Sequence, residues 1–557
     1  MSLSTKALLT PELRGRLAVD PNLGLGNVLR SAVAVNPHPD VPFITSARPI
    51  VNSAGQEQTD FSLLDIDRLA QSWSVWYLSR GVGPRDRVAV FIEDTFAYTI
   101  HLHALAQIGA IAVLINSKMT KEMALALCRQ TGVIGMYTDS SRLARLGDEI
   151  STLSTLRFVQ LAEELPAPPT AELRGTARFH AVGEDPAVIL LSSGTTGLPK
   201  AVTHTHASIT AGPQYRLANF TESPESLMMA AQPQSHAGAI GYAIYAVLAG
   251  TPMVALYDPT GPEMLSAVVR YRPTMVLAFA HAYSDLAAME IPKTTLDSVI
   301  GWISMADAVH EAHMKKILGQ RSTNLPQEAV FYDRFGSTEV AWGLMVAQRR
   351  LSTDRSDRRM GVPDRLAEFA VLRPDGSKAA VGECGLIGVK SPTVTAGYWS
   401  NSDLTWRSKL AGYWLTGDVG YQDDEGTYFQ VDRAVDVIRT DPATGYSVLM
   451  EELLLAEVVD ILDCAVVAGK HLGRIVPVAV ITSSAANVDP KSTLKQANEA
   501  LRTAGFPELA LLEVARNPED LPVGVTGKVL KRQLRDRYES LEHYLISAND
   551  RCLAAII

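Results

Sequence analysis

The segment from Leu190 to Lys200 has the composition of a phosphate-binding loop. An apolar strand there leads into small residues that leave backbone N–H groups open, hydroxyls that can donate to oxyanions, and a lysine cation. A Walker A loop is excluded, because Pro199 stands where glycine should precede the lysine and Ala201 where serine or threonine should follow it. The alternative for this segment alone is a solvated surface loop. The full segment is Leu190-Leu191-Ser192-Ser193-Gly194-Thr195-Thr196-Gly197-Leu198-Pro199-Lys200.

Three later segments carry acidic, hydroxyl and basic residues beside glycine. Seen alone, Glu339 or Asp418 is more often a solvated carboxylate, and Lys528 an ordinary turn lysine. For His236, an ordinary structural histidine remains the alternative. The segments are Tyr332-Asp333-Arg334-Phe335-Gly336-Ser337-Thr338-Glu339, then Trp414-Leu415-Thr416-Gly417-Asp418-Val419-Gly420-Tyr421 with Asp432-Arg433 behind it, and finally Pro522-Val523-Gly524-Val525-Thr526-Gly527-Lys528-Val529.

An alternation of helices and apolar strands is expected to position these segments. The pattern predicts a helix over 64–78, a strand over 87–92, a helix over 97–109 and a strand over 110–115. Further apolar runs follow at 187–191, 252–256, 274–278 and 299–304. Apolar strands that alternate with helices indicate parallel sheets covered on both faces.

A different pattern occupies residues 384–429. Short alternating segments separated by turn residues predict an antiparallel β region with hairpins. A mixed pattern resumes after Arg433, with a helix over 451–461 and apolar runs at 465–468 and 475–481. We therefore predict an α/β protein with a large N-terminal body of mixed and parallel sheets covered by helices, a β-rich subdomain and a small mobile α+β C-terminal domain. The boundary places residues 1–432 in the first domain and 433–557 in the second.

Composition narrows the class of partner. The chain has 557 residues, 47% of them hydrophobic, which suggests about three or four folding units and a large core. Its net charge of −9 disfavours a nucleic-acid surface or a polybasic membrane anchor. Four dispersed cysteines, no signal-peptide pattern and no long apolar segment favour a cytoplasmic protein without a membrane span. Small molecules are the expected partners, and the oligomeric state stays open.

Together the four segments, in this order, resemble the motifs of the adenylate-forming superfamily, the AMP-dependent synthetases and ligases. This superfamily contains acyl-CoA synthetases, peptide-synthetase adenylation domains and luciferases. The resemblance covers nearly the whole chain beyond the first ~40 residues. It implies that a carboxylate attacks the α-phosphorus of ATP to give an acyl-adenylate and pyrophosphate, after which a thiol takes the acyl group. Because both reacting groups are anions, a metal and several cations are needed to offset their repulsion.

The resemblance also implies roles for individual residues. Lys200 would add positive charge to the phosphate loop, Thr338 would bind the α-phosphate, and Glu339 would ligate Mg²⁺, which prefers oxygen ligands. His236 would lie beside the acyl pocket, and Lys528 would bridge the attacking carboxylate and the α-phosphate. The expected nucleotide-binding residues are Ser192, Ser193, Gly194, Thr195, Thr196, Gly197, Asp307, Asp333, Phe335, Asp418 and Arg433, with adenine near Asp333 and Phe335 and ribose at Asp418, assisted by Arg433.

Some positions depart from the family pattern. The segment Ser304-Met305-Ala306-Asp307-Ala308 carries larger side chains than usual, which could shorten or narrow the pocket. Gln234-Ser235 replaces a common Leu-Phe pair and favours a polar pocket wall. Val435 follows the hinge where Asp or Lys is frequent, and the loop over 441–445 is altered. Tyr242, Phe279, His281, Met305 and Ala306 are candidate wall residues, each equally compatible with core packing.

The sequence thus predicts an enzyme that uses ATP and Mg²⁺ to activate a small or aromatic carboxylic acid and passes it to CoA or to a carrier thiol. No carrier domain is evident in the chain, so a carrier would be a separate protein. One alternative keeps AMP activation but uses an amine acceptor, or activates an oxyacid for N–N bond (diazo) chemistry without CoA. A nucleotide-binding regulatory protein with a degenerate site is disfavoured, because Lys200, Glu339 and Lys528 are all retained.

Overall fold

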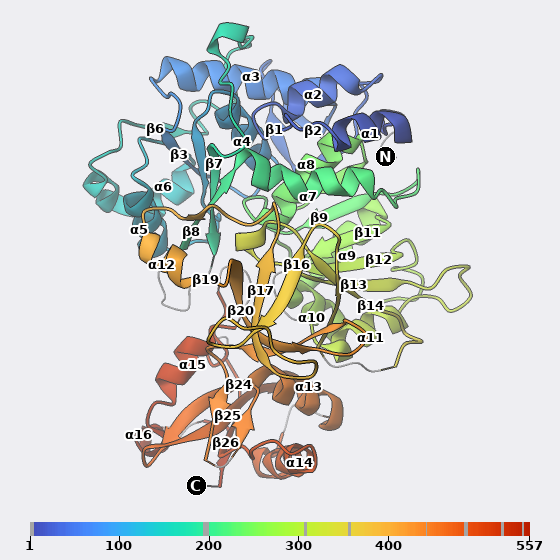
Figure 1. Ribbon diagram of the computed structural model, residues 1–557, viewed down its shortest axis with the longest axis vertical. Coiled ribbons are helices and arrows are strands. Elements are labelled where there is room, and N and C mark those ends of the chain that lie inside the picture. Colours follow the sequence, from blue (N-terminus) through green and yellow to red (C-terminus); the bar gives the residue numbers. More distant parts are fainter. Residues whose placement is uncertain are drawn as a thin grey trace.

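Two β-sheets that share packed helices form the larger part of the molecule, and a smaller unit carries the C-terminus (Figure 1). The computed structural model describes residues 5–192, 200–305, 309–354, 358–441, 443–459, 461–483, 488–517, 519–524, 529–547 and 551–556. None of the helices in these ranges combines the length and apolar character needed to span a bilayer.

The first sheet is largely parallel and buried. Its strands run through apolar stretches such as Arg87–Phe91, where four of the five residues are inaccessible to solvent, as expected for strands covered on both faces. The helix that precedes this strand begins at a capping box formed by Ser62 and Asp65. In spatial order the strands are β18 (Gly397–Tyr398), β8 (Lys200–Thr205), β7 (Pro186–Ser192), β4 (Ile111–Leu114), β3 (Arg87–Phe91), β5 (Gly135–Thr138) and β6 (Phe158–Leu161). The helices in this part of the chain are α3 (Leu63–Ser79), α4 (Ala97–Gln107), α5 (Lys121–Thr131) and α6 (Ser140–Leu146).

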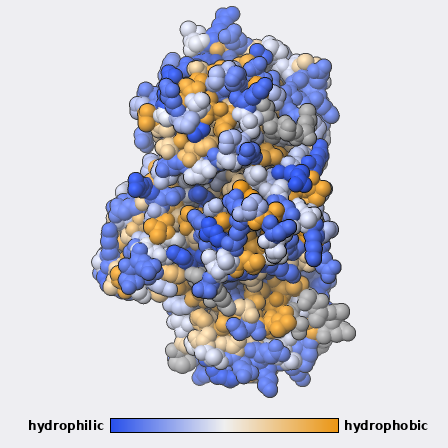
Figure 2. Space-filling view, turned by 90° about the vertical axis from the view of Figure 1, so that its right-hand side faces the viewer, coloured by the Kyte–Doolittle hydropathy of each residue, from blue (hydrophilic) through white to orange (hydrophobic). Residues whose placement is uncertain are grey.

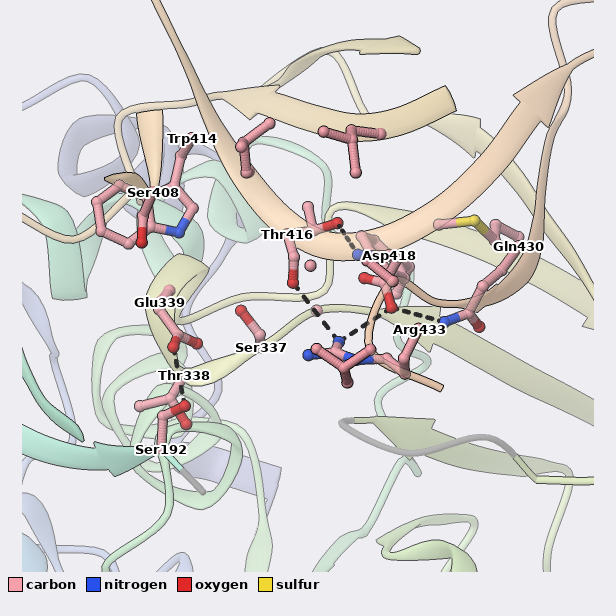
Figure 3. Close-up of a pocket in the computed structure, with 18 of the residues that line it drawn as sticks. Ser192, Ser337, Thr338, Glu339, Ser408, Trp414, Thr416, Asp418, Gln430 and Arg433 are labelled. Atoms are coloured by element: carbon pink, nitrogen blue, oxygen red, sulfur yellow. Dashed lines mark hydrogen bonds and ion pairs between the residues drawn. The ribbon is translucent and has the colours of Figure 1, made fainter. Parts of the chain in front are cut away.

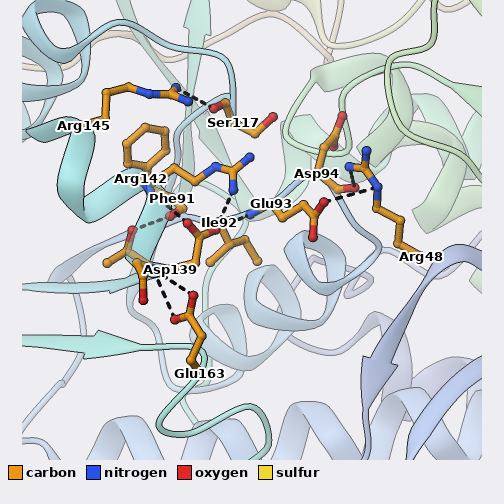
Figure 4. Close-up of polar contacts among 12 residues, drawn as sticks. Arg48, Phe91, Ile92, Glu93, Asp94, Ser117, Asp139, Arg142, Arg145 and Glu163 are labelled. Carbon is orange, nitrogen blue, oxygen red and sulfur yellow. Dashed lines mark hydrogen bonds and ion pairs between the residues drawn. The ribbon is translucent and has the colours of Figure 1, made fainter.

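The carboxyl ends of β3, β4 and β5 carry a polar network (Figure 4). Asp139 accepts from the backbone N–H of Glu93 at 2.7 Å and pairs with Arg142 at 3.0 Å. Arg145 donates to the carbonyl of Ser117 at 2.8 Å. The chain passes from β3 to β4 on one side and then crosses from β4 to β5 on the other side of β3, and such a switch point is a common ligand site in α/β sheets. Here these polar groups bond to one another and to the backbone, and so hold together the loops that follow β3, β4 and β5.

The second sheet changes from parallel to antiparallel along its width. Parallel pairing links β1, β10, β9, β11, β12 and β13, and antiparallel pairing continues from β13 to β16. In spatial order its strands are β16 (Glu368–Leu372), β17 (Gly385–Lys390), β20 (Tyr413–Gln422), β21 (Tyr428–Arg433), β15 (Arg359–Pro363), β14 (Met345–Arg349), β13 (Val330–Phe335), β12 (Gly301–Met305), β11 (Met275–Ala278), β9 (Met228–Ala231), β10 (Met253–Ala255), β1 (Ile44–Val51) and β2 (Glu57–Phe61), with β19 (Lys409–Leu410) beside β20.

A fully buried helix, α8 (Ala237–Ala249), lies in the core of this body. All of its residues are inaccessible, and it packs against α7 (His206–Ala218) and α2 (Val28–Val35). A helix that is apolar on every side is stable only where packing surrounds it. Other helices of the body are α1 (Pro11–Ala18), α9 (Gly261–Tyr271), α10 (Ala280–Ala288), α11 (Glu311–Gly319) and α12 (Ser402–Arg407).

After Arg433 the strands form separate sheets at the lower end of Figure 1. Hydrophobic side chains gather on this part of the face shown in Figure 2. A short hairpin of β22 (Ile438–Arg439) and β23 (Thr444–Gly445) precedes the sheet β24 (Ile461–His471), β25 (Arg474–Ser483), β26 (Leu511–Val514) and β27 (Leu553–Ala555). Its helices are α13 (Ser447–Glu457), α14 (Pro490–Thr503), α15 (Lys531–Arg537) and α16 (Leu541–Ser547).

The predicted fold class is confirmed, with two local differences. The helix predicted over 451–461 begins and ends four residues earlier, and Ile461 instead opens β24; the β-branched pair Val458-Val459 disfavours helix there. The antiparallel region also begins before residue 384, at β14. The domain boundary at 432/433 and the mobility of the second domain stay predictions.

Candidate active site

One cavity of about 410 Å³ lies where β7, β8, β13, β20 and β21 come together (Figure 3). It is lined by nine of the residues predicted from the sequence, together with residues that the sequence did not single out. The predicted ones are Ser192, Lys200, His236, Asp333, Phe335, Thr338, Glu339, Asp418 and Arg433. The predicted residues Ser193, Gly194, Thr195, Thr196, Gly197, Asp307 and Lys528 lie outside the described residues.

Glu339 is held in a turn (Thr338–Val340) that follows β13. Its side chain is buried, and Oε1 accepts hydrogen bonds from the Ser192 hydroxyl at 2.8 Å and from the Tyr398 hydroxyl at 3.1 Å. Thr338 donates through Oγ1 to the carbonyl of Leu191 at 3.1 Å. The end of β7 and the Thr338–Glu339 segment are therefore joined directly, as Figure 3 shows for Ser192 and Glu339.

His204 is a buried residue that bonds the Thr338–Glu339 segment, and the sequence did not single it out. Burial lowers its pKa to about 4, so the imidazole is neutral at pH 7. The Thr338 carbonyl can only accept, so Nε2 of the neutral imidazole carries the proton and donates to it at 2.7 Å. Nδ1 is then unprotonated and accepts from the Ser208 hydroxyl at 3.1 Å, while Ser208 Oγ accepts from the Thr205 N–H. In the sequence His204 lies four residues after Lys200, but this spacing alone does not predict a functional role.

Lys200 and Ser192 face each other across the pair β7–β8, at the two ends of the segment that the sequence predicts to hold phosphates. The Lys200 ammonium lies 5.4 Å from the centroid of the Tyr398 ring, the same tyrosine that bonds Glu339. A cation at this distance is attracted to the ring face. The arrangement brings one cation, one carboxylate and a hydroxyl group to one side of the cavity.

Asp418 and Arg433 form a second polar group on neighbouring strands. They are cross-strand partners in β20 and β21, and Arg433 donates to Asp418 Oδ1 at 2.9 Å. Gln430 donates to the same oxygen at 2.7 Å, while Asp418 itself is only 1% exposed. The Asp418 carboxylate raises the pKa of the Arg433 guanidinium. A buried carboxylate held in this way is suited to accept hydrogen bonds from vicinal hydroxyls.

Arg358 is a further cavity residue that the sequence did not single out. Its guanidinium donates to Gln430 Oε1 and lies 3.7 Å from the Glu452 carboxylate of α13. Gln430 in turn bonds Asp418, so this arginine connects the cavity to the C-terminal part of the chain.

His236 lies at the start of α8, where its Nδ1 accepts from the Gly238 N–H at 3.1 Å. The Phe279 ring meets its imidazole edge-on, with centroids 4.8 Å apart. Of the candidate wall residues, Tyr242, Phe279, His281 and Met305 do not line the cavity, and Ala306 lies outside the described residues.

The donor set at Glu339 fits a magnesium ion. Magnesium is usually held by one or two carboxylates together with substrate phosphates and water. Within the described ranges, no three His, Cys, Asp or Glu side chains gather into an all-protein metal site. A metal here would therefore rely on Glu339 and on oxygens that arrive with a nucleotide.

The chain is similar in sequence to known proteins. The AMP-binding enzyme family matches residues 32–399. A 3-aminoavenalumate diazotase from Streptomyces sp is 32% identical over 96% of this chain and 100% of its own length. A feruloyl-CoA synthase from Amycolatopsis sp is 26% identical over 82% of this chain and 90% of its own.

Solved structures share the fold. An anthranilate CoA ligase in complex with anthranoyl-AMP superposes with a TM-score of 0.79, at 19% identity over 95% of this chain and 99% of its own. An o-succinylbenzoate CoA synthetase from Bacillus subtilis, in complex with ATP and magnesium ion, gives 0.74 at 20% identity over 92% and 99%. At these identities the likeness concerns the fold alone.

Proposed function

The chain belongs to the AMP-binding enzyme family, and we propose that it is an AMP-forming ligase that activates a small or aromatic carboxylic acid as an acyl-adenylate and then transfers the acyl group to CoA. The observation that supports this most is the meeting of Ser192, Thr338 and Glu339 with the Asp418–Arg433 pair in one cavity. The support is that groups suited to phosphates and groups suited to a ribose line the same cavity.

In this proposal, different sides of the cavity bind different parts of the nucleotide. Ser192, Lys200 and Thr338 bind the phosphates, and Glu339 holds a magnesium ion that neutralises phosphate charge. Asp418 accepts hydrogen bonds from the ribose hydroxyls, with Arg433 beside it, and Asp333 and Phe335 contact the adenine. Hydrogen bonds from neighbouring side chains hold the Glu339 and Asp418 carboxylates in place. The Ser192 and Thr338 hydroxyls, which donate to Glu339 and to the Leu191 carbonyl, would turn toward the phosphates when a nucleotide binds.

The residues outside the described ranges complete the proposal. Ser193, Gly194, Thr195, Thr196 and Gly197 would surround the β- and γ-phosphates. Asp307 would contact the nucleotide. Lys528 would bridge the attacking carboxylate and the α-phosphate from the C-terminal domain, residues 433–557. A separate carrier protein could replace CoA as the thiol, and the expected location is the cytoplasm.

A second candidate changes the acid and the acceptor, and the diazotase relative favours it. Nitrite oxygen would attack the α-phosphorus of ATP and expel pyrophosphate. An aryl amine nitrogen would then attack the activated nitrogen and expel AMP with loss of a proton. The resulting N-nitrosamine, after proton uptake, would lose water to give the diazonium ion. The nucleotide-binding residues are common to both candidates, so only the second half of the reaction separates them.

The test is pyrophosphate release with ATP, Mg²⁺ and a panel of acids that includes nitrite, acetate and benzoate. Each productive acid is then incubated with CoA or with an aryl amine, and products are identified by mass spectrometry. A thioester with AMP supports the ligase, whereas a diazonium product supports the second candidate. Absence of pyrophosphate with every acid would reject both.

A further inference from the structure

We propose that Arg358 is a positioning residue for the nucleotide, and that it links the seating of α13 to the carboxylate of Asp418. The inference rests on the proposed function, in which Asp418 binds the ribose, and adds a residue that acts on Asp418 through Gln430. It is carried by a continuous series of side-chain contacts and by the backbone conformation of Arg358.

Arg358 has a backbone conformation that is costly for an arginine. It directly precedes β15, and its φ of 56° lies in the left-handed region, which glycine adopts freely and other residues adopt rarely. Its side chain is only 8% exposed and lines the main cavity. Strained positions of this kind persist where the surrounding structure holds them, and they cluster at functional sites. The contacts of the buried guanidinium therefore indicate its role.

Gln430 of β21 is held by Arg358 at its main chain and at its side chain. The backbone N–H of Gln430 donates to the carbonyl of Arg358 at 3.0 Å, and the Arg358 guanidinium donates to Gln430 Oε1. A guanidinium can only donate, so Oε1 faces Arg358 and the amide nitrogen is turned the other way. That nitrogen donates to Asp418 Oδ1 at 2.7 Å. Arg358 thus determines which end of the amide meets the Asp418 carboxylate.

Gln430 and Arg433 donate to the same oxygen of Asp418 (Figure 3). Because both use Oδ1, Oδ2 keeps its capacity to accept from a ribose hydroxyl. A carboxylate only accepts and a guanidinium only donates, so a group that links Asp418 to Arg358 must do both, as an amide does. The orientation of the proposed ribose acceptor therefore depends on Arg358, although the two side chains do not bond directly to each other.

The other side of the Arg358 guanidinium faces α13. It lies 3.7 Å from Oε1 of Glu452, a buried carboxylate. Glu452 is also 3.1 Å from Nδ1 of His310 and accepts from the backbone N–H of Glu311 at 3.3 Å. A buried carboxylate needs such partners, and these belong to the body, so Glu452 is satisfied here only while α13 is seated. Seating of α13 therefore also holds the guanidinium that orients Gln430.

The experiment measures the binding of ATP and of 3′-deoxy-ATP, each with Mg²⁺ and without an acid, by titration calorimetry. We expect the wild-type protein to bind ATP about tenfold or more tightly than the deoxy analogue, because the analogue loses a hydrogen bond to a charged group. In Arg358→Met the Kd for ATP should rise by about five- to tenfold, the scale of one hydrogen bond, and the preference for ATP should fall by the same factor. A general loss of packing would weaken both nucleotides equally and leave the preference unchanged.

A double-mutant cycle tests the link to α13. Glu452→Gln alone should weaken ATP binding by a smaller factor than Arg358→Met does. The double variant should bind ATP no more weakly than Arg358→Met, because residues that act in one series of contacts have non-additive effects.

Arg85→Met is the matched control. Arg85 also has a positive φ, 66°, and pairs with Asp185 at 3.2 Å, but its side chain is 72% exposed in the turn before β3. This variant should bind both nucleotides as the wild type does. Arg358→Gly adopts the left-handed backbone freely and also lacks the guanidinium, so it decides the question if Arg358→Met does not fold.

A wild-type protein that binds both nucleotides equally, or an unchanged preference in both Arg358 variants, would overturn the positioning role. Additive losses in the double variant would overturn the link to α13. These outcomes leave adenylation standing. A wild-type protein that binds no ATP would reject this inference and the proposed function together, whereas the expected binding without pyrophosphate release for any acid would reject the proposed function alone.

Discussion

The carboxylate of Glu452 in α13 lies 3.1 Å from Nδ1 of His310, the residue that precedes α11. The backbone N–H of Glu311 donates to the other oxygen of Glu452 at 3.3 Å, and Arg358 lies 3.7 Å away. The C-terminal part of the chain is thus joined to the body by a buried acid with two cationic partners. Because Arg358 also bonds Gln430, which bonds Asp418, these contacts extend to the proposed ribose site.

The first prediction concerns pH. Glu452 raises the pKa of His310 to about 9, and His310 lowers the pKa of Glu452 to about 2, in both cases against the effect of burial. A histidine whose pKa is higher in the folded than in the unfolded protein contributes its full stabilisation of the fold below the unfolded pKa of about 6.5. This stabilisation is lost as the pH rises through the folded pKa of about 9. Wild-type Tm should therefore fall between pH 7 and 10. Glu452→Gln should flatten this fall, whereas Glu499→Gln, on the exposed face of α14, should not.

Lys528→Ala should reduce adenylate formation by about 100-fold or more, the scale of losing a positioned charge from an electrostatic site. Thioester formation from preformed acyl-adenylate should change much less, because Lys528 is proposed to act on the α-phosphate in the first half-reaction. Lys495→Ala, at an exposed position of α14, is the control. Equal losses in both half-reactions would contradict the assigned role.

Glu339→Gln should raise the Mg²⁺ concentration needed for half-maximal rate and lower the rate of adenylation. The amide oxygen can still accept from Ser192 and Tyr398, so the melting temperature should change little. A metal titration monitored by pyrophosphate release measures both effects, with the exposed Glu328→Gln as the comparison. A titration curve identical to that of the wild type would remove Glu339 from the metal site.

Asp418→Asn should lower kcat/KM for ATP by about 10- to 100-fold, since hydrogen bonds to a charged group contribute roughly 1.5–3 kcal/mol. The ribose role predicts more than a loss of rate. Wild-type enzyme should discriminate against 3′-deoxy-ATP, and the variant should discriminate much less. Asp424→Asn, in the exposed turn of the same hairpin, should behave as wild type. Undiminished discrimination in Asp418→Asn would exclude a contact with that hydroxyl.

The sequence predicted the fold class and most elements because the apolar runs have clear periods and clear ends. It also predicted that Ser192, Thr338, Glu339, Asp418 and Arg433 belong together, through motif order and not through geometry. The structure adds the physical links between them, such as the Ser192–Glu339 hydrogen bond.

Other contacts had no local signal. Tyr398 bonds Glu339 across 59 residues, and Gln430 bonds Asp418 only because strand register places the two on neighbouring strands. Trp342 was not singled out, because its packing depends on Gly212 of α7 and Gly241 of α8, which lie far from it in the sequence. Such information lies in tertiary packing, which composition and spacing do not encode.

The loop between β13 and β14 carries Thr338 and Glu339 at its start and Trp342 a few residues later. The Trp342 indole fills the space left by Gly212 of α7 and Gly241 of α8, where an added methyl group would lie 2.5 Å and 3.2 Å from it. A short stretch of chain therefore ties the turn that holds Glu339 to two buried helices far away in the sequence. A larger residue at either glycine would push on this turn, so a mutation remote from the cavity would still displace the Glu339 carboxylate.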